Sequence, residues 1–108
     1  MGNSNEVPKS VIDFPSNKEL TVNLRIEHCG KWGMQAMYDF AEKCIKTAYP
    51  KANITKNFSE SRGQFLIYFK TEKGEEIELY NKNAKDGGFS EKTAVTALER
   101  IKKQAENA

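Results

Sequence analysis

The stretch that decides the fold is Leu20–Glu27, LTVNLRIE. Apolar residues alternate strictly with polar residues along it, and the apolar positions are Leu20, Val22, Leu24 and Ile26. Because successive side chains of a β-strand point to opposite faces, this period of two predicts a strand with one buried and one solvated face. A parallel strand covered on both faces would show a continuous apolar run instead. The stretch therefore predicts two layers, with helices packed on one side of a sheet.

The segments that follow supply the remaining elements. Apolar residues from Met34 to Ala48 recur at steps of three and four, which predicts an amphipathic helix, and Pro50 ends it because the residue before a proline avoids helical geometry. Strands are predicted at 52–58, 64–70 and 75–81, the last two joined by a hairpin turn at 71–74. Ser90 is a good N-cap for a final amphipathic helix.

The predicted order is therefore β-α-β-β-β-α. A right-handed crossover makes the first two strands parallel, and the hairpin adds antiparallel partners. The fold class is α/β (α+β), with a four-stranded mixed sheet and two helices on one face. Residues 1–17 are polar and contain Pro8 and Pro15, so we predict a mobile N-terminal tail followed by one domain at 18–108. Val11, Ile12 and Phe14 could dock locally, but the sequence does not indicate where.

Composition and charge argue against several classes of binding partner. The 17 basic and 15 acidic residues leave a net charge of +2, which argues against a nucleic-acid partner. No apolar run is long enough to span a membrane, and no secretory signal is evident. With only two cysteines, the chain is expected in a reducing, cytoplasmic compartment. One histidine and two distant cysteines do not make a zinc site, so we expect no metal and no bound cofactor.

The candidate chemical centre follows the first strand, in Arg25–Met34, RIEHCGKWGM. Cys29 lies in a turn between a strand and a helix, where the N–H groups and the dipole of the helix favour a thiolate. Lys31 could assist that thiolate electrostatically. Gly30 is expected to serve turn geometry. Three residues after the cysteine, where a resolving thiol normally lies, the chain has Trp32.

Val22–Met34, with CGKWG at its centre, resembles the selenoprotein W (Rdx) family of thioredoxin-like proteins. That family carries a Cys-x-x-Cys or Cys-x-x-selenocysteine motif followed by glycine. The likeness continues to Tyr49-Pro50 and returns at Gly63–Phe65 and Asp86–Phe89. The resemblance implies a two-layer thioredoxin-like fold, a redox role for Cys29 in cell redox homeostasis, and glutathione or a protein thiol as the partner.

Trp32 departs from the family pattern because it occupies the position of the second cysteine or selenocysteine. It is a natural replacement, an engineered choice, or a UGA codon that was written as tryptophan, and the sequence leaves these three open. Cys44 does not replace the missing thiol. It lies about eleven residues along the helix, roughly 16 Å at 1.5 Å per residue, whereas a disulfide needs Cα atoms within about 7 Å. We expect Cys44 in the core.

Two other side chains, His28 and Arg62, are candidates to assist Cys29. His28 is adjacent to it, but adjacent strand residues point to opposite faces, so we expect a packed or surface histidine rather than a general base. Arg62 precedes the third strand, and in thioredoxin-like folds this loop lies beside the cysteine turn. Its guanidinium is a candidate to stabilise the thiolate or to hold a glutathione carboxylate, and a solvated turn arginine is the alternative.

Two hypotheses follow for function. The first is a thiol redox protein of the selenoprotein W type, which uses Cys29 for one-thiol exchange or glutathionylation with glutathione as co-substrate. If this is an enzyme, its activity is that of a glutathione-linked thiol-disulfide oxidoreductase. The alternative is a non-enzymatic adaptor, in which the Cys29–Trp32 turn and the Gly87–Phe89 loop form a protein-binding surface, since exposed aromatic residues often anchor interfaces.

Overall fold

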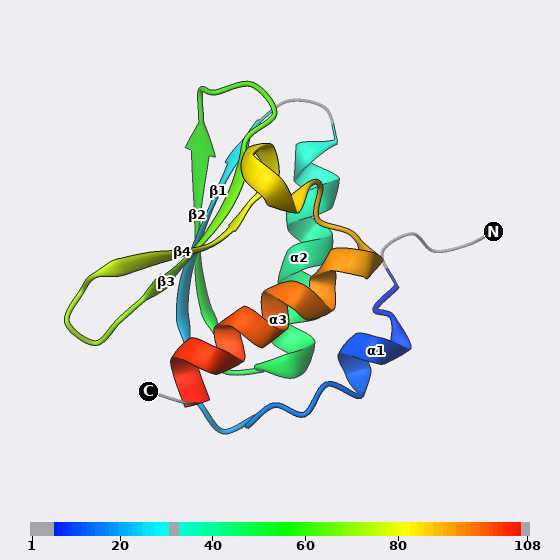
Figure 1. Ribbon diagram of the computed structural model, residues 1–108, viewed down its shortest axis with the longest axis vertical. Coiled ribbons are helices and arrows are strands. Elements are labelled where there is room, and N and C mark those ends of the chain that lie inside the picture. Colours follow the sequence, from blue (N-terminus) through cyan, green and yellow to red (C-terminus); the bar gives the residue numbers. More distant parts are fainter. Residues whose placement is uncertain (1–5, 31–32, 107–108) are drawn as a thin grey trace.

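A four-stranded mixed sheet lies against the helices in the computed structural model, which describes residues 6–30 and 33–106 (Figure 1). The elements in chain order are α1 (Lys9–Ile12), β1 (Asn23–Cys29), α2 (Met34–Ala48), β2 (Asn53–Ser59), β3 (Phe65–Lys70), β4 (Glu76–Asn81), the short π-helix η1 (Lys82–Asp86) and α3 (Glu91–Glu106).

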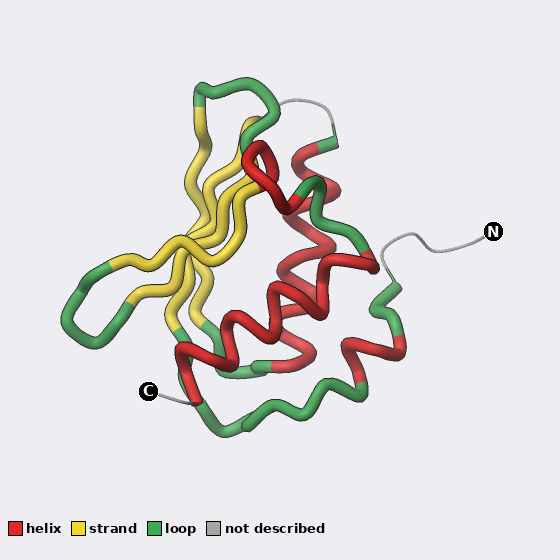
Figure 2. The backbone as a smooth tube through the Cα atoms, in the orientation of Figure 1, coloured by secondary structure: helices red, strands yellow, loops and turns green. Residues whose placement is uncertain are grey.

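The sheet has the strand order β2-β1-β3-β4. β1 and β2 are parallel, with Asn23 opposite Asn53, and both the β1–β3 and the β3–β4 pairs are antiparallel. All helices lie on one side of the sheet (Figure 2). The predicted fold class, strand order along the chain and two-layer arrangement are confirmed, with the short α1 and η1 as additions.

The alternation in the first strand is also seen in the burial of its side chains. Leu24 and Ile26 are buried on the face that packs against the helices, whereas Arg25 and Glu27 lie on the opposite, uncovered face. On that face the Arg25 guanidinium makes ion pairs with Glu27 and Glu76, both at 2.8 Å. Polar side chains thus stabilise the open face without a second layer of helices.

The N-terminal segment differs from the predicted mobile tail. Between Lys9 and Phe14 it packs on the core, because Val11 and Phe14 are both buried there. Hydrogen bonds hold the chain that follows: Lys102 donates to the carbonyl of Pro15 at 2.6 Å, and Ser16 donates to the carbonyl of Ala48 at 2.5 Å. The packed domain therefore includes residues before position 18.

The loop predicted at 82–88 contains one turn of π-helix. Asp86 organises it, because its carboxylate accepts hydrogen bonds from the Asn81 backbone at 2.8 Å and from Arg100 at 3.0 Å. Arg100 also donates to the carbonyl of Leu79 at 2.8 Å, which connects α3 to the end of β4. Within residues 6–30 and 33–106, no helix is long and apolar enough to cross a membrane.

Candidate functional site

Cys29 is the last residue of β1, the central position in the sheet between β2 and β3. Its backbone N–H donates to the carbonyl of Gln64 at 2.9 Å, and it lies opposite Ser59 in the β1–β2 register. The residue is only 2% exposed. The structure thus places Cys29 at the end of the strand rather than in the turn after it, and the residue is buried. Lys31 and Trp32, the other predicted residues of the turn, lie outside the described residues.

Glycine at position 33 is required by the backbone. Gly33 precedes α2 as its N-cap with a φ of 77°, and a Cβ built there would meet no atom within 4 Å. The requirement is therefore conformational, since side chains rarely adopt the left-handed region. Gly30 differs, because a Cβ at that position would lie 3.4 Å from the ring of Phe58. The expected role in turn geometry is therefore supported for Gly33, whereas Gly30 has no positive φ and only an ordinary contact with Phe58.

His28 is fully buried on the helix-covered face, beside the cysteine turn. Its ring stacks on Tyr38 with centroids 5.2 Å apart and meets the edge of Phe58 at 5.3 Å. Nδ1 lies 2.8 Å from the carbonyl oxygen of Cys29, so Nδ1 carries a proton and donates it to that bond. Nε2 has no hydrogen-bond partner among the described residues. Of the packed or surface histidine that was expected, the structure shows the packed one, and its ring contacts the peptide carbonyl of Cys29.

The β2–β3 loop lies at the same end of the sheet as the cysteine turn, as expected (Figure 1). Ser59 and Gln64 close this loop through a 2.6 Å hydrogen bond between their side chains. Arg62 lies within the loop and is exposed. Its guanidinium makes no ion pair with any residue that the structure describes. The structure thus brings the loop of Arg62 to the end of the sheet where Cys29 lies, and Arg62 is exposed there; its role at the thiol stays a prediction.

Phe89 is a core residue and not part of an exposed patch. It is only 5% exposed, and its ring lies 5.9 Å from the rings of Phe40 and Phe65 and 5.5 Å from that of Tyr80, centroid to centroid. Its backbone N–H donates to the sulfur of Met37 at 3.4 Å. The expectation of an exposed Phe89 ring that anchors a partner is therefore wrong, although the residue still contributes to the lining of a surface groove.

Cys44 is buried on the core face of α2, as predicted. Burial raises the pKa of its thiol to about 12, so it stays protonated at neutral pH. No disulfide joins Cys44 to Cys29. Within the described residues, no cluster of histidine, cysteine, aspartate or glutamate is arranged to hold a metal ion.

Phe58 is the residue of this region that the sequence did not single out. Its side chain is 67% exposed, yet it borders both Gly30 and His28. The ammonium group of Lys56 lies 5.2 Å from its ring centroid and 4.7 Å from that of Tyr38. The available signal was a lone aromatic residue near the end of an otherwise polar strand, NITKNFS.

Comparison of the chain with family models, with curated proteins and with solved structures gives no match in any of the three. The resemblance to the selenoprotein W family therefore stays a prediction from the motif and its spacing.

Proposed function

We propose that this chain is a thiol redox protein that acts through Cys29 alone, in the manner of a selenoprotein W-type protein with one thiol. The observation that carries the proposal is the position of Cys29, at the end of the central strand and immediately before the turn that leads into α2. Cys44 is protonated in the core and leaves the reaction to Cys29. Glutathione or a protein thiol is the partner, and the cytoplasm supplies the reducing conditions that such a thiol needs.

The reaction is thiol–disulfide exchange. The Cys29 thiolate attacks one sulfur of oxidised glutathione, a bond forms between these two sulfurs, and the original disulfide breaks. The second glutathione leaves as a thiolate, which takes up a proton equivalent to the one that Cys29 released. A thiol of reduced glutathione or of a partner protein then attacks the mixed disulfide, which returns Cys29 to its reduced form and leaves the attacking thiol in a new disulfide.

The burial of Cys29 limits how a disulfide can reach its sulfur. At 2% exposure, the sulfur cannot be reached by a disulfide unless its neighbours move first. Exposed loops open locally at small free energies compared with a buried strand. The β2–β3 loop, which contains the exposed residues Glu60, Ser61 and Arg62, is the adjoining element that can open in this way.

The test is mass spectrometry of the native protein after incubation with oxidised glutathione. We expect an adduct on the wild type and on Cys44→Ser, and none on Cys29→Ser. The matched pair of serine variants assigns the modified residue, and circular dichroism shows that each variant is folded. A native protein that stays unmodified through long exposure, while the unfolded protein reacts normally, would overturn the redox proposal.

A second candidate function is that of a non-enzymatic adaptor, and the difference in exposure between Phe58 and Cys29 favours it. Phe58 is 67% exposed beside the turn, whereas Cys29, at the end of β1, is only 2% exposed. An aromatic ring in this position is suited to anchor a partner protein, since aromatic residues are enriched at interface centres. The same experiment separates the candidates, because the adaptor predicts a Cys29 thiol that remains unmodified in the folded protein.

A further inference from the structure

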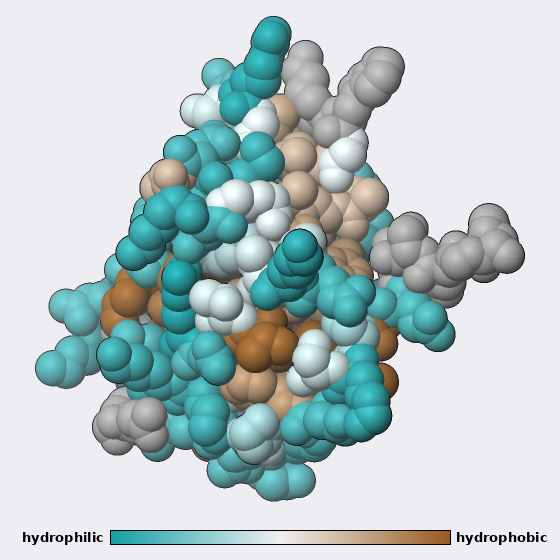
Figure 3. Space-filling view, turned by 45° about the vertical axis from the view of Figure 1, so that its right-hand side comes forward, coloured by the Kyte–Doolittle hydropathy of each residue, from teal (hydrophilic) through white to brown (hydrophobic). Residues whose placement is uncertain are grey.

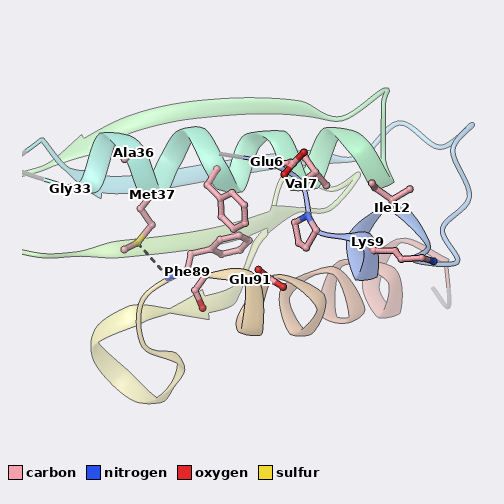
Figure 4. A pocket seen from close by; sticks show the side chains of 12 residues that line it. Glu6, Val7, Lys9, Ile12, Gly33, Ala36, Met37, Phe89 and Glu91 are labelled. Atoms are coloured by element: carbon pink, nitrogen blue, oxygen red, sulfur yellow. Dashed lines mark hydrogen bonds between the residues drawn. The ribbon is translucent and has the colours of Figure 1, made fainter. Parts of the chain in front are cut away.

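A surface groove lies between the N-terminal segment, α2 and the start of α3 (Figure 4). Its volume is about 760 Å³, within the range of protein ligand sites. The apolar part of its lining comes from three separate segments and comprises Val7, Ile12, Ala36, Met37, Phe40 and Phe89. At one end the groove reaches Gly33, where the cysteine turn passes into α2.

One wall of the groove carries a large apolar side chain that is exposed to solvent. Ile12 is 55% exposed, and within the described part of the chain only Phe58 is a comparably exposed large apolar residue. On the face turned toward this side of the molecule, apolar side chains group between hydrophilic ones (Figure 3). Val11, the neighbour of Ile12, is fully buried and anchors α1 in place. The exposed position of Ile12 is therefore held by the fold.

The rim of the groove carries negative charge. Glu6 and Glu91 lie on opposite sides of it in the close view (Figure 4). Neither makes an ion pair with another described residue. Lys9 is the basic residue of the lining, and it is already paired with Asp13 on its own helix. An approaching ligand therefore meets two carboxylates that have no cationic partner within the described residues.

We propose that this groove binds a segment of a partner protein in which apolar side chains neighbour a lysine or an arginine. The apolar lining accepts the first and the carboxylates of Glu6 and Glu91 attract the second. The groove is open to solvent, so a small molecule would stay largely hydrated there, whereas a chain segment covers its whole length. Glutathione itself is anionic and does not fit this rim. Binding here does not require Cys29 to react.

The probe is a labelled hexapeptide that alternates leucine and arginine, compared with one that alternates leucine and glutamate and one that alternates serine and arginine. We expect the leucine–arginine peptide to bind most tightly in fluorescence anisotropy, and its advantage over the leucine–glutamate peptide to shrink as salt is added. Methyl NMR signals of Ile12 and Met37 should shift on binding, because both side chains line the groove.

Substitutions in the lining of the groove test whether the peptide binds there. Replacing both rim carboxylates, with Glu6→Gln and Glu91→Gln, should weaken the leucine–arginine peptide by roughly three- to tenfold, as expected for two surface charges. Ile12→Ala should weaken all peptides that contain leucine. The matched control is Glu72→Gln, an exposed carboxylate on the hairpin far from the groove in sequence and outside its lining.

Equal affinity for the acidic and basic peptides, no binding of any peptide at millimolar concentration, or an equal effect of the Glu72 control would overturn the proposal. Cys29→Ser separates it from the redox proposal, because that variant should bind the peptide as the wild type does. Loss of binding in Cys29→Ser would show instead that the peptide is captured at the cysteine turn.

Discussion

Phe89→Ala is the substitution that tests the corrected role of this residue. The ring is almost fully buried and contacts three other aromatic rings, those of Phe40, Phe65 and Tyr80. These rings come from α2, β3 and β4, so Phe89 joins the sheet to a helix just before α3 begins. Truncation to alanine leaves a cavity among them.

The expected loss in the free energy of unfolding is about 3–5 kcal/mol, the usual range for phenylalanine to alanine in a core. A domain of this size has a total stability of about 5–15 kcal/mol, so the loss is a large fraction of it. At roughly 4 °C or more per kcal/mol, the melting temperature should fall by more than about 10 °C. Phe89→Leu keeps most of the apolar volume and should lose less.

The assay is urea unfolding followed by far-UV circular dichroism, with the slope m compared between wild type and variant. An unchanged m shows that the midpoint shift reports stability. Ile12→Ala is the control, because its side chain is 55% exposed and its replacement should change stability by only about 0.5 kcal/mol. If Phe89→Ala loses less than about 1 kcal/mol, the ring is not a core element, and the Gly87–Phe89 loop becomes a binding surface again.

Three further predictions concern Gly33, Glu106 and Cys44. Gly33→Ala should lose about 1–2 kcal/mol in urea unfolding because its φ of 77° is left-handed, and Gly33→Asn should lose less; an unchanged midpoint would contradict this. Hydrogen bonds from Lys102, the Asn17 backbone and Tyr49 lower the pKa of Glu106 to about 2, so their contribution is complete above its ordinary value of 4.5 and is lost as the pH falls toward 2. Glu106→Gln should therefore flatten the melting temperature between pH 5 and pH 2, about the interval spanned by these two pKa values, and an unaltered profile would refute the assignment. Iodoacetamide should modify Cys44 only as fast as the protein unfolds, because its thiol is buried with a pKa raised to about 12; modification independent of added urea would contradict this.

The sheet was predictable because its signals are local. The alternation in Leu20–Glu27 reports directly which side chains face the helices, and the structure buries Leu24 and Ile26 accordingly. Proline and glycine mark the ends of the elements between the strands. Once the order of elements is known, the handedness of the crossover leaves few arrangements.

The misassigned features depend on contacts between distant segments. Val11 and Phe14 fall in a polar stretch, and their burial requires α2 and α3 to be in place already. Phe89 follows two glycines, a pattern that also fits an exposed loop, and only the position of the sheet decides that its ring is buried. No local pattern reports such packing.

In the candidate site, too, some features were predictable from local sequence and others depend on distant contacts. The strand–turn–helix pattern put Cys29 in the turn, whereas the structure makes it the last residue of β1, and His28 is buried on the helix-covered face. The aromatic neighbours of His28 could not be found from the pattern, because Phe58 reaches it from β2, thirty residues further along the chain. The near-complete burial of Cys29 was likewise not predictable from the motif.

The burial of Cys29 determines how its rate of reaction should be interpreted. β1 is paired on both sides, and the Cys29 backbone is bonded to Gln64, so the strand end itself is held firmly. The exposed β2–β3 loop, which Ser59 and Gln64 close, adjoins this strand end, and we expect its movement to give access to the sulfur. A slow reaction of Cys29 would therefore measure the opening of this loop rather than a weak nucleophile. A partner protein that binds near the turn and displaces the loop would raise the rate without changing any group at the thiol.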